Sequence, residues 1–472
     1  MTVPAVVLAA PASGSGKTTL ATGIMGALTD QGMRVAPFKV GPDYIDPGYH
    51  GLATGRVGRN LDAVLTSPEL IGPLYQHGSR GCDIAVIEGV MGLFDGRIGS
   101  GEPAIGSTAH IAALLGAPVV LVVDVRGHSQ SLAALLHGFA TFDARVRIAG
   151  VILNQVGSER HAEVLREACD RAGMPVLGCV PRLDAATVRS RHLGLVTARE
   201  GGAAAMAARD AMVSLASTHI DLDAIRAIAR ASTRDEAWDP AVAMPLAAGA
   251  QERRERAAGP ARIAVAAGPA FSFVYAEQDE LLEAAGADIV RFDPLTDPLP
   301  PSTSGLILPG GFPEEHAAGL AANSLVRAQI RGAIELGMPV HAECAGLVYL
   351  ARELDGHEMV GALDLRARFG KRLVLGYRDA TALLSSAMFE PGERITGHEF
   401  HRTSVDAGPG WSGTAGQAQV AWGWRAHDGT AVREGIVHRG VHASYLHTHP
   451  VARPAAMARF LQRAAASAGV TA

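Results

Sequence analysis

A glycine-rich segment near the beginning of the sequence carries the residue types that bind nucleotide phosphates. It reads Ala9-Ala-Pro-Ala-Ser-Gly-Ser-Gly-Lys-Thr-Thr19, follows a short apolar run and precedes a helical pattern that begins at Leu20. Between a strand and a helix, backbone N–H groups and the helix N-terminus form a cradle for anions. Lys17 would reach the outer phosphates and the Thr18 hydroxyl would bind magnesium, although Pro11 replaces a usual glycine. The candidate ATP-binding residues of this loop are Ser13, Gly14, Ser15, Gly16, Lys17, Thr18 and Thr19.

Polar residues at the ends of other apolar runs extend this candidate site. Glu88 follows Ile84-Ala-Val-Ile87 and suits a carboxylate that acts on magnesium directly or through water. Lys39 ends another run and leads into Val40-Gly-Pro-Asp-Tyr-Ile-Asp46. A lysine and two acids directly after a buried strand favour a functional site over charged residues that are merely exposed on a turn. Asn154, at the end of a later run, would hydrogen-bond either a base edge of a nucleotide or its own turn.

A second candidate site surrounds one cysteine. The segment Met338-Pro-Val-His-Ala-Glu-Cys-Ala-Gly346 joins an apolar run to a helical pattern through small residues, which is typical of an elbow that presents a nucleophile. We expect the helix N-terminus to lower the pKa of the Cys344 thiol. Gly310 and Gly311, in an earlier turn, would supply backbone donors to an oxyanion hole. A buried, inert cysteine is the alternative.

A cysteine nucleophile needs a base, and the C-terminal part of the sequence is rich in histidine. His447 directly follows a short apolar run and is the candidate base. The order of a Gly-Gly turn, a cysteine elbow and a late histidine is more specific than any one histidine. Other histidines that could act instead are His398, His401, His438, His442 and His449.

The elements that must position these residues follow an α/β pattern. Short apolar runs alternate with helical patterns, as a parallel sheet requires, and candidate residues stand at the carboxyl ends of the runs. The strands predicted in the first half are Val3–Ala10, Val35–Val40, Ile84–Glu88, Val119–Val123, Ile148–Leu153 and Val176–Val180. Those predicted in the second half are Arg262–Ala266, Ile289–Phe292, Gly305–Pro309 and Pro339–Ala342, with antiparallel elements after Arg366.

The chain of 472 residues is too long for one ordinary core. We predict domains over residues 1–225 and 261–472, joined by a linker over 226–260 where charge and alanine replace the pattern. The charged run Gln251–Arg256 belongs to this linker. The C-terminal segment Ala455–Arg463 has an apolar face that we expect to pack onto the second domain rather than on a membrane.

Composition and charge exclude several classes of protein. A net charge of -5 gives no electrostatic footprint for nucleic acid. The four cysteines form no CxxC pair, so we expect no disulfide framework, no structural zinc and a reducing cytoplasm. No apolar run approaches the roughly 20 residues of a membrane span, and Met1–Ala10 is interpreted as a buried strand rather than a signal peptide. A homodimer stays open as the assembly.

Together these motifs resemble the cobyrinic or hydrogenobyrinic acid a,c-diamide synthases of cobalamin biosynthesis, over essentially the whole chain. The front half is similar to dethiobiotin-synthetase-like P-loop ATPases, and the back half to class I, triad-type glutamine amidotransferases. The stretches that carry the resemblance are Ser15-Gly-Lys-Thr-Thr19, Lys39-Val-Gly-Pro-Asp-Tyr-Ile-Asp46, Glu88-Gly-Val-Met-Gly-Leu-Phe-Asp95, Arg191-His-Leu-Gly-Leu195, Cys344, Gly397-His-Glu-Phe-His401 and Ala443-Ser-Tyr-Leu-His447.

The resemblance implies a glutamine-hydrolysing carbon–nitrogen ligase. Cys344 would release ammonia from glutamine through a thioester with His447 as base, and triad-type domains usually add a glutamate where this chain has His449. The site would therefore run as a Cys-His dyad or recruit an acid from elsewhere. The front domain would use ATP and magnesium to phosphorylate a carboxylate, and ammonia would then displace phosphate. The resemblance places the corrinoid polycarboxylate near Lys39, Asp43, Tyr44 and Asp46, and the candidate magnesium ligands are Thr18, Glu88 and Asp43.

Other functions stay open. Cobyric acid synthase shares both domains, and amidation of another tetrapyrrole, such as a nickel sirohydrochlorin, would use the same chemistry. A partitioning or membrane-cycling ATPase switch usually has a second lysine in the loop, where this chain has Ala12. An inactive amidotransferase that only binds would leave Cys344 and His447 together unexplained. Whether the corrin contains cobalt also stays open, and we favour the metal-free substrate.

Overall fold

The structure, a computed structural model, divides the chain into two compact units. They comprise Met1–Trp238 and Asp239–Ala472, and the structure describes residues 2–98, 105–182, 202–244, 260–407 and 419–467. The division lies inside the predicted linker, of which the charged run Gln251–Arg256 is outside the described residues. The part of the linker before the division belongs to the first unit, because Arg230 N donates to Ala5 O at 2.8 Å. Among the described residues, no helix is long and apolar enough to cross a membrane.

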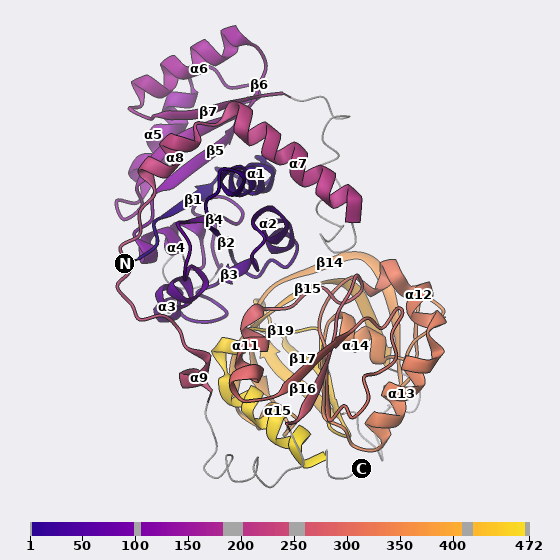
Figure 1. The fold of residues 1–472 in the computed structure, drawn as a ribbon. Coiled ribbons are helices and arrows are strands. Elements are labelled where there is room, and N and C mark those ends of the chain that lie inside the picture. Colours follow the sequence, from indigo (N-terminus) through magenta and orange to yellow (C-terminus); the bar gives the residue numbers. More distant parts are fainter. Residues whose placement is uncertain (1, 99–104, 183–201, 245–259, 408–418, 468–472) are drawn as a thin grey trace. The chain divides into compact units, whose positions relative to one another are not determined.

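Seven parallel strands form the sheet of the first unit (Figure 1). Their order is β3-β2-β4-β1-β5-β6-β7, so β1 lies between β4 and β5. The six strands predicted for this half are confirmed within three residues at each end, whereas β3 was missed because it contains a single large apolar residue, Leu61. The strands are β1 (Ala5–Ala9), β2 (Val35–Val40), β3 (Arg59–Leu61), β4 (Ile84–Glu88), β5 (Val119–Asp124), β6 (Ile148–Val156) and β7 (Val176–Pro181).

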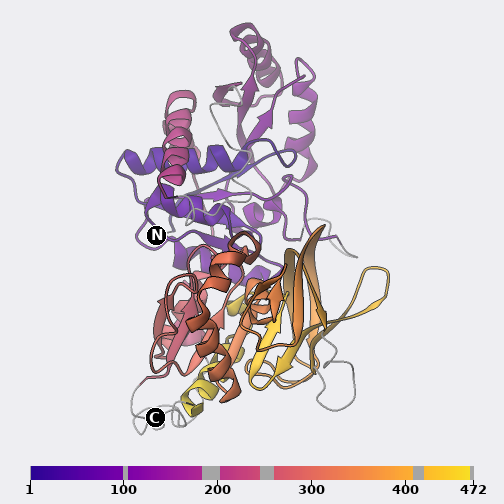
Figure 2. The same cartoon turned by 90° about the vertical axis from the view of Figure 1, so that its right-hand side faces the viewer.

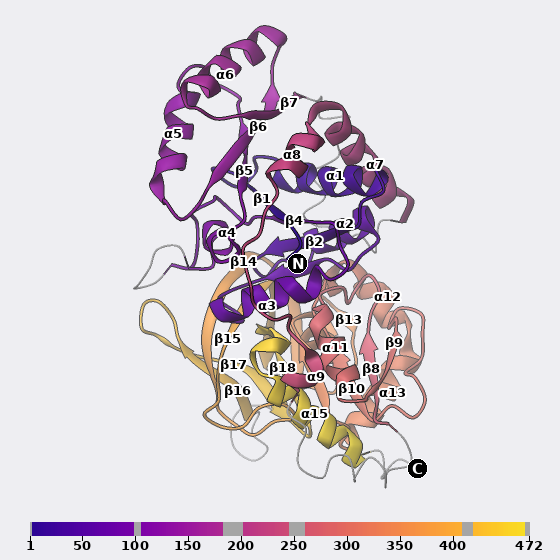
Figure 3. The ribbon, with the colours of Figure 1, turned by 60° about the vertical axis from the view of Figure 1, so that its left-hand side comes forward.

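Helices cover both faces of this sheet (Figure 3). On one face Leu20 and Ile24 of α1 and Val213 of α7 pack with Leu8 and Val120 in a buried cluster. The chain crosses the sheet in one direction from β1 to β2 and in the other from β4 to β5, so right-handed crossovers place α1 and α4 on opposite faces. The helices are α1 (Lys17–Asp30), α2 (Asp46–Thr54), α3 (Pro68–Gly78), α4 (Thr108–Leu115), α5 (Leu132–Phe142), α6 (Glu159–Arg171), α7 (Gly202–His219) and α8 (Leu222–Ile228).

The second unit contains a mixed sheet. Strands β9, β8, β10, β11 and β18 are parallel neighbours, and β14 to β17 pair in antiparallel fashion, as predicted for the segment after Arg366. Figure 2 shows these antiparallel strands, in orange to yellow, beside the parallel part of the unit. The strands are β8 (Arg262–Ala266), β9 (Asp288–Phe292), β10 (Gly305–Leu308), β11 (Val340–Glu343), β12 (Glu353–Leu354), β13 (His357–Glu358), β14 (Leu365–Ala382), β15 (Arg394–Ala407), β16 (Gln419–Arg425), β17 (Ala431–His438), β18 (Val441–Ser444) and β19 (His447–Thr448).

Two groups of helices enclose the parallel strands of this second unit. Ile330 of α13 and Val348 of α14 pack with Leu306 and Val340 in its core cluster. The C-terminal helix α15 packs onto β10 through the fully buried Phe460, which confirms the predicted contact of this segment with the second domain. The helices are α9 (Pro240–Ala243), α11 (Ala276–Ala284), η2 (Pro313–His316), α12 (Ala317–Ala322), α13 (Ser324–Glu335), α14 (Ala345–Leu350), η4 (Pro450–Ala452) and α15 (Pro454–Ser467).

Candidate active sites

The phosphate loop, residues Ala9–Thr19, runs from the end of β1 into α1 as predicted. Gly16 has a φ of 90°, a conformation that residues with a side chain rarely adopt. A Cβ atom there would lie 2.4 Å from Nδ2 of Asn154. The same Nδ2 donates to the Ser15 carbonyl oxygen at 2.9 Å, and the Asn154 Oδ1 accepts from the next backbone N–H at 3.0 Å. Asn154 therefore braces the phosphate loop while also forming its own turn.

Lys17, the first residue of α1, is buried inside the loop. Its Nζ donates to the carbonyl oxygen of Met91 at 2.6 Å and to that of Ala12 at 3.5 Å. Burial and the charge of Lys39 lower the pKa of Lys17 from 10.5 to about 8. Phosphate oxygens are stronger acceptors than carbonyls, so they would compete well for this ammonium group. Of the other predicted loop residues, Ser13 and Gly14 are exposed, Ser15 is buried and Thr19 is half-buried.

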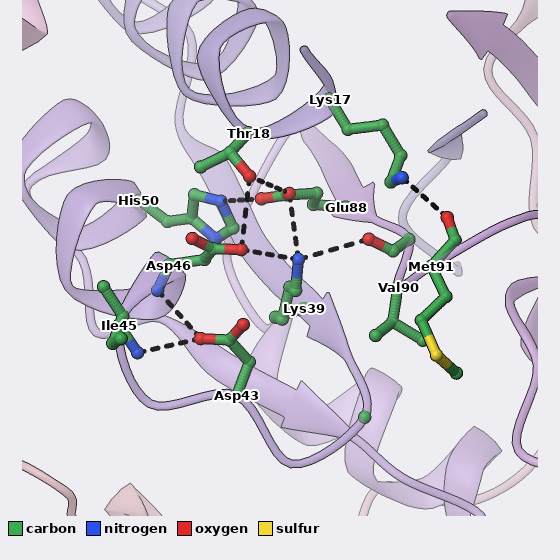
Figure 4. A network of polar contacts seen from close by, with 12 residues as sticks. Lys17, Thr18, Lys39, Asp43, Ile45, Asp46, His50, Glu88, Val90 and Met91 are labelled. Atoms are coloured by element: carbon green, nitrogen blue, oxygen red, sulfur yellow. Dashed lines mark hydrogen bonds and ion pairs between the residues drawn. The ribbon is translucent and has the colours of Figure 1, made fainter. Parts of the chain in front are cut away.

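Lys39 links the carboxylates of Asp46 and Glu88 in one polar network (Figure 4). Its Nζ donates to Asp46 Oδ2 at 2.6 Å and to Glu88 Oε1 at 2.9 Å. The Thr18 hydroxyl donates to Glu88 Oε1 at 2.6 Å, and His50 Nε2 lies 2.7 Å from Glu88 Oε2. Strands β2 and β4 pair in parallel with Lys39 beside Glu88, so the sheet register itself brings these opposite charges together.

The charges of this network shift the pKa values of its members. Burial alone would lower the pKa of Lys39, but the carboxylates of Asp46 and Glu88 outweigh burial and raise it above its usual value. Burial would raise the pKa of Glu88, but Lys39 and His50 hold it below its usual value. For Asp46, burial and the charge of Glu88 outweigh Lys39 and raise the pKa. Lys39 and Glu88 therefore form a charged ion pair. The Asp46 carboxyl group beside them takes up a proton at a higher pH than an ordinary aspartate does.

The turn after β2 gives its two aspartates different roles. Asp43 Oδ1 accepts from the backbone N–H groups of Ile45 and Asp46 at 2.8 and 3.0 Å, as an aspartate in an Asx turn does. Asn60 holds this turn by donating to the Asp43 carbonyl oxygen at 2.7 Å. Tyr44 is half-buried in the same turn. The geometry therefore favours Asp46 rather than the predicted Asp43 as the second carboxylate beside Glu88.

The oxygen atoms around Thr18 fit a magnesium ion. The Thr18 hydroxyl lies 2.6 Å from Glu88 Oε1 and 3.3 Å from Asp46 Oδ2. Magnesium usually binds one or two carboxylates together with substrate phosphates and several waters, so a complete protein cage is unnecessary. In the part of the chain that the structure describes, no group of three or more His, Cys, Asp or Glu side chains forms such a cage. His50 was missed, although its position four residues after Asp46 on α2 was a usable signal.

Cys344 lies in the predicted elbow between β11 and α14. Its φ of 49° and ψ of -97° are strained for a residue with a side chain, as expected for a nucleophile on a tight strand-to-helix turn. Its backbone N–H donates to the Ser444 carbonyl oxygen at 2.7 Å. The thiol itself is buried and lies 3.9 Å from the carbonyl oxygen of Phe400, within the stretch Gly397–His401 of β15. All four cysteines are free thiols.

The prediction of a low thiol pKa is wrong for this structure. Burial, followed by the negative charge of Glu314, raises the pKa of Cys344 well above its usual value. Hydrogen bonds from the backbone N–H groups of Ala345 and Gly311 only partly oppose this rise. Helix α14 has six residues, so its dipole is too small to outweigh burial. The thiol therefore needs a base that removes its proton during attack.

The Gly310–Gly311 turn lies beside both the thiol and His447. A Cβ atom at Gly310 would lie 2.4 Å from His447 Cε1, whereas the N–H of Gly311 hydrogen-bonds with Cys344. The imidazole and the thiol therefore both lie beside the Gly310–Gly311 turn. Of the two predicted oxyanion residues, Gly311 has the donor and Gly310 makes room for the imidazole. Ala345 supplies a second donor and was missed, although the residue after an elbow nucleophile commonly does so.

His447 is fully buried at the beginning of β19 and faces a carboxylate that was not predicted. Its Nδ1 lies 3.6 Å from Oε2 of Glu343, the residue before the nucleophile. Thr448 donates to Glu343 Oε1 from its backbone N–H at 3.0 Å and from its hydroxyl at 2.9 Å. Burial would raise the pKa of Glu343, but His341 and His447 hold it below its usual value. The carboxylate is therefore ionised.

The other candidate histidines have different surroundings. Burial, above all, lowers the pKa of His398 and His442 to about 3 and that of His449 to about 4, so all three are neutral. The His449 Nδ1 accepts from a backbone N–H in η4 at 3.3 Å. His401 and His438 lie on β15 and β17. The stretch Arg191-His-Leu-Gly-Leu195, which contributed to the resemblance, lies outside the described residues.

Comparisons with known proteins match both units. The CobQ/CobB/MinD/ParA nucleotide binding domain matches residues 6–195, and the CobB/CobQ-like glutamine amidotransferase domain matches residues 262–455. Hydrogenobyrinate a,c-diamide synthase from Mycobacterium tuberculosis is 58% identical over 98% of this chain and 99% of that protein. The protein of the same name from Streptomyces coelicolor is 53% identical over 98% of this chain and 97% of its own length. Cobyrinate a,c-diamide synthase from Gloeobacter violaceus is 43% identical over 98% of both chains.

Proposed function

Because the chain belongs to the family of hydrogenobyrinate and cobyrinate a,c-diamide synthases, we propose that it amidates the a and c carboxylates of hydrogenobyrinic acid with ammonia from glutamine, using ATP. The observation that carries this proposal is the presence of two complementary sites on one chain. The phosphate loop with Lys39, Asp46 and Glu88 can activate a carboxylate, and the pair Cys344 and His447 can release ammonia. Amide synthesis needs both steps, and cobalamin biosynthesis is the pathway that the family resemblance implies.

Activation of the carboxylate is assigned to the first unit. A carboxylate oxygen of the substrate attacks the γ-phosphorus of ATP, the bond to the ADP oxygen breaks, and an acyl phosphate forms. Lys17 and the loop N–H groups neutralise the charge that develops on the transferred phosphoryl group. Magnesium, when held by Thr18 with Glu88 and Asp46, would add to this neutralisation. Ammonia then attacks the acyl carbon, phosphate leaves, and the amide nitrogen loses its surplus proton.

Release of ammonia is assigned to the second unit. Cys344 transfers its proton to His447 while the sulfur attacks the carboxamide carbon of glutamine, and the N–H groups of Gly311 and Ala345 stabilise the oxyanion. His447 returns the proton to the nitrogen, the C–N bond breaks and ammonia leaves a thioester behind. Water, deprotonated by His447, then cleaves the thioester to glutamate and free thiol. The raised pKa of Cys344 makes proton transfer a necessary part of the attack.

The choice of the metal-free corrin rests on the relatives. The two proteins named for hydrogenobyrinate are 58% and 53% identical to this chain, whereas the one named for cobyrinate is 43% identical. A corrin polycarboxylate carries several negative charges and would bind beside the cationic Lys39, with Asp43, Tyr44 and Asp46 in the adjacent turn. Lys39 keeps its positive charge because Asp46 and Glu88 raise its pKa.

The experiment that tests the proposal offers two substrates to the purified full chain. Magnesium-ATP and glutamine are added with either hydrogenobyrinic or cobyrinic acid, and the products are weighed by mass spectrometry. We expect two amides on hydrogenobyrinic acid and fewer on cobyrinic acid. Amidation of cobyrinic acid alone would reverse the metal assignment, and ATP hydrolysis without any amide would favour an ATPase switch. Cobyric acid synthase would instead add four amides to a corrin that already carries the a and c amides.

A further inference from the structure

We propose that Glu343, the residue immediately before the nucleophile, is the positioning carboxylate that orients His447 in the amidotransferase site. This inference rests on the proposed function and deepens it by naming the third member of that site. The position that usually holds this acid is occupied by His449, whose lowered pKa of about 4 leaves it neutral. Glu343 would therefore complete the Cys344–His447 pair from a different place in the fold.

The contacts of Glu343 tie it to the strand that carries the imidazole. Its Oε2 lies 3.6 Å from His447 Nδ1. Its Oε1 accepts two hydrogen bonds from Thr448, the neighbour of His447 on β19, at 3.0 and 2.9 Å. His341 Nε2 lies 3.2 Å from the same oxygen. Three groups thus fix the carboxylate so that its second oxygen faces the imidazole.

A carboxylate at this place determines which nitrogen of His447 carries the proton. An ionised Glu343 can only accept hydrogen bonds, and His341 and His447 hold its pKa below its usual value. With a proton on Nδ1 facing Glu343, the Nε2 lone pair is left to accept the thiol proton, and the resulting imidazolium is stabilised. The 3.6 Å separation is longer than a hydrogen bond, but catalytic contacts often shorten into hydrogen bonds when substrate binds.

Two other carboxylates of the second unit, Glu399 and Glu434, face different partners. Glu399 Oε2 accepts from Arg378 at 2.6 Å. Glu434 accepts from the Ser444 hydroxyl at 2.5 Å and from the Tyr445 backbone N–H at 2.7 Å. Neither arrangement presents an oxygen to His447 as Glu343 does. Of these three carboxylates, Glu343 is the one that faces His447, at 3.6 Å.

A double-mutant cycle on the full chain tests this role. Glutamate release from glutamine is measured for wild type, Glu343→Gln, His447→Ala and the double variant, and ammonium-salt-dependent amide formation is measured for each. Glu343→Gln should lower kcat for glutamine hydrolysis by at least about 100-fold, as loss of an orienting acid does in other triads. The KM for glutamine should change by less than about threefold, because the acid acts on the base rather than on the substrate. In the His447→Ala background the same substitution should change the rate by less than about threefold.

A matched control and a second variant make the outcome decisive. Glu393→Gln removes a carboxylate that pairs with Arg459 at 2.6 Å in the same unit. It should leave both activities within about twofold, because its partner lies on α15 and not at the elbow or on β19. The proposal is overturned if Glu343→Gln keeps most of its glutamine hydrolysis, or if its loss is equally large without His447.

The ammonia-dependent assay distinguishes a variant that fails to fold from one that has lost only glutamine hydrolysis. Should Glu343→Gln also lose ammonia-dependent synthesis, Thr448→Val is measured in its place, because it removes only the hydroxyl that donates to Glu343 at 2.9 Å. We expect glutamine hydrolysis to fall about tenfold in Thr448→Val, and an unchanged rate overturns the role of Glu343. Failure of the proposed function looks different, because wild type itself would then form no amide from either nitrogen source.

Discussion

Replacing Lys39 with methionine removes one charge from the buried network of the first unit and keeps a side chain of similar length. The side chain of Lys39 is 4% exposed and that of Glu88 is 0% exposed, so water cannot replace the lost ammonium group. Removing one partner of a buried ion pair typically costs about 3–5 kcal/mol. We therefore expect the free energy of unfolding of Lys39→Met to fall by about 3–4 kcal/mol at pH 7, because proton uptake by a carboxylate limits the loss.

Proton uptake sets an upper limit to this loss. A carboxylate with an unfolded pKa near 4 is protonated at pH 7 at a cost of about 4 kcal/mol, because each pH unit corresponds to about 1.4 kcal/mol. The pKa of Glu88, which Lys39 holds low in the wild type, should lie above the unfolded value in the variant, so folding takes up a proton and stability decreases as pH rises. The destabilisation should therefore shrink from about 4 kcal/mol at pH 7 to about 1.4 kcal/mol at pH 5.

Urea unfolding of the full chain, followed by pulse proteolysis, measures this difference. Fragments assigned to residues 1–238 by mass spectrometry report the first unit separately, because the two units need not unfold together. Arg126→Met is the matched control, since it removes an equal charge from an exposed pair with Asp124 and should change stability by less than about 1 kcal/mol. A loss below about 1 kcal/mol at pH 7, or an equal loss at pH 5, would refute the assignment of a buried ion pair.

Three further substitutions separate the two half-reactions. Cys344→Ala should abolish glutamine-dependent amide formation and leave formation from an ammonium salt within about twofold, because only the ammonia supply is lost; absence of rescue by ammonia would contradict its role as glutaminase nucleophile. Lys17→Ala should lower synthesis from either nitrogen source by at least about 100-fold, because phosphoryl transfer loses its main cation. Ammonia-dependent synthesis that survives in this variant would contradict the assignment of the phosphate loop. Gly310→Ala should lower glutamate release at least about tenfold and spare ammonia-dependent synthesis, because its Cβ would come within 2.4 Å of His447 Cε1; normal glutamate release would show that the imidazole has more room.

Sequence reasoning predicted the features that depend on local pattern. Buried parallel strands are continuous apolar runs, and glycine or a polar residue marks their ends, so β2, β4 and β8 were predicted with their observed bounds. The phosphate loop and the cysteine elbow are likewise single segments in which spacing determines geometry. Lys17 and Cys344 could therefore be placed on their elements from the sequence alone.

The features that were missed depend on contacts between distant segments. Glu343 meets His447 because β11 pairs with β18 and the chain then turns into β19, which no local pattern indicates. The preference for Asp46 over Asp43 follows from the backbone hydrogen bonds that Asp43 Oδ1 accepts from Ile45 and Asp46. The pKa of Cys344 was misjudged because the short helix was visible in the sequence and the depth of burial was not.

The contacts of Lys39 also bear on which amine reacts at the synthase site. An acyl phosphate is attacked by any neutral amine, so a lysine beside it competes with ammonia and would acylate itself. Lys39 donates to Asp46 at 2.6 Å and to Glu88 at 2.9 Å, and these carboxylates raise its pKa. A protonated amine has no lone pair to donate. The buried network therefore keeps this side chain protonated and unreactive, so Lys39 does not compete with ammonia in the proposed acyl transfer.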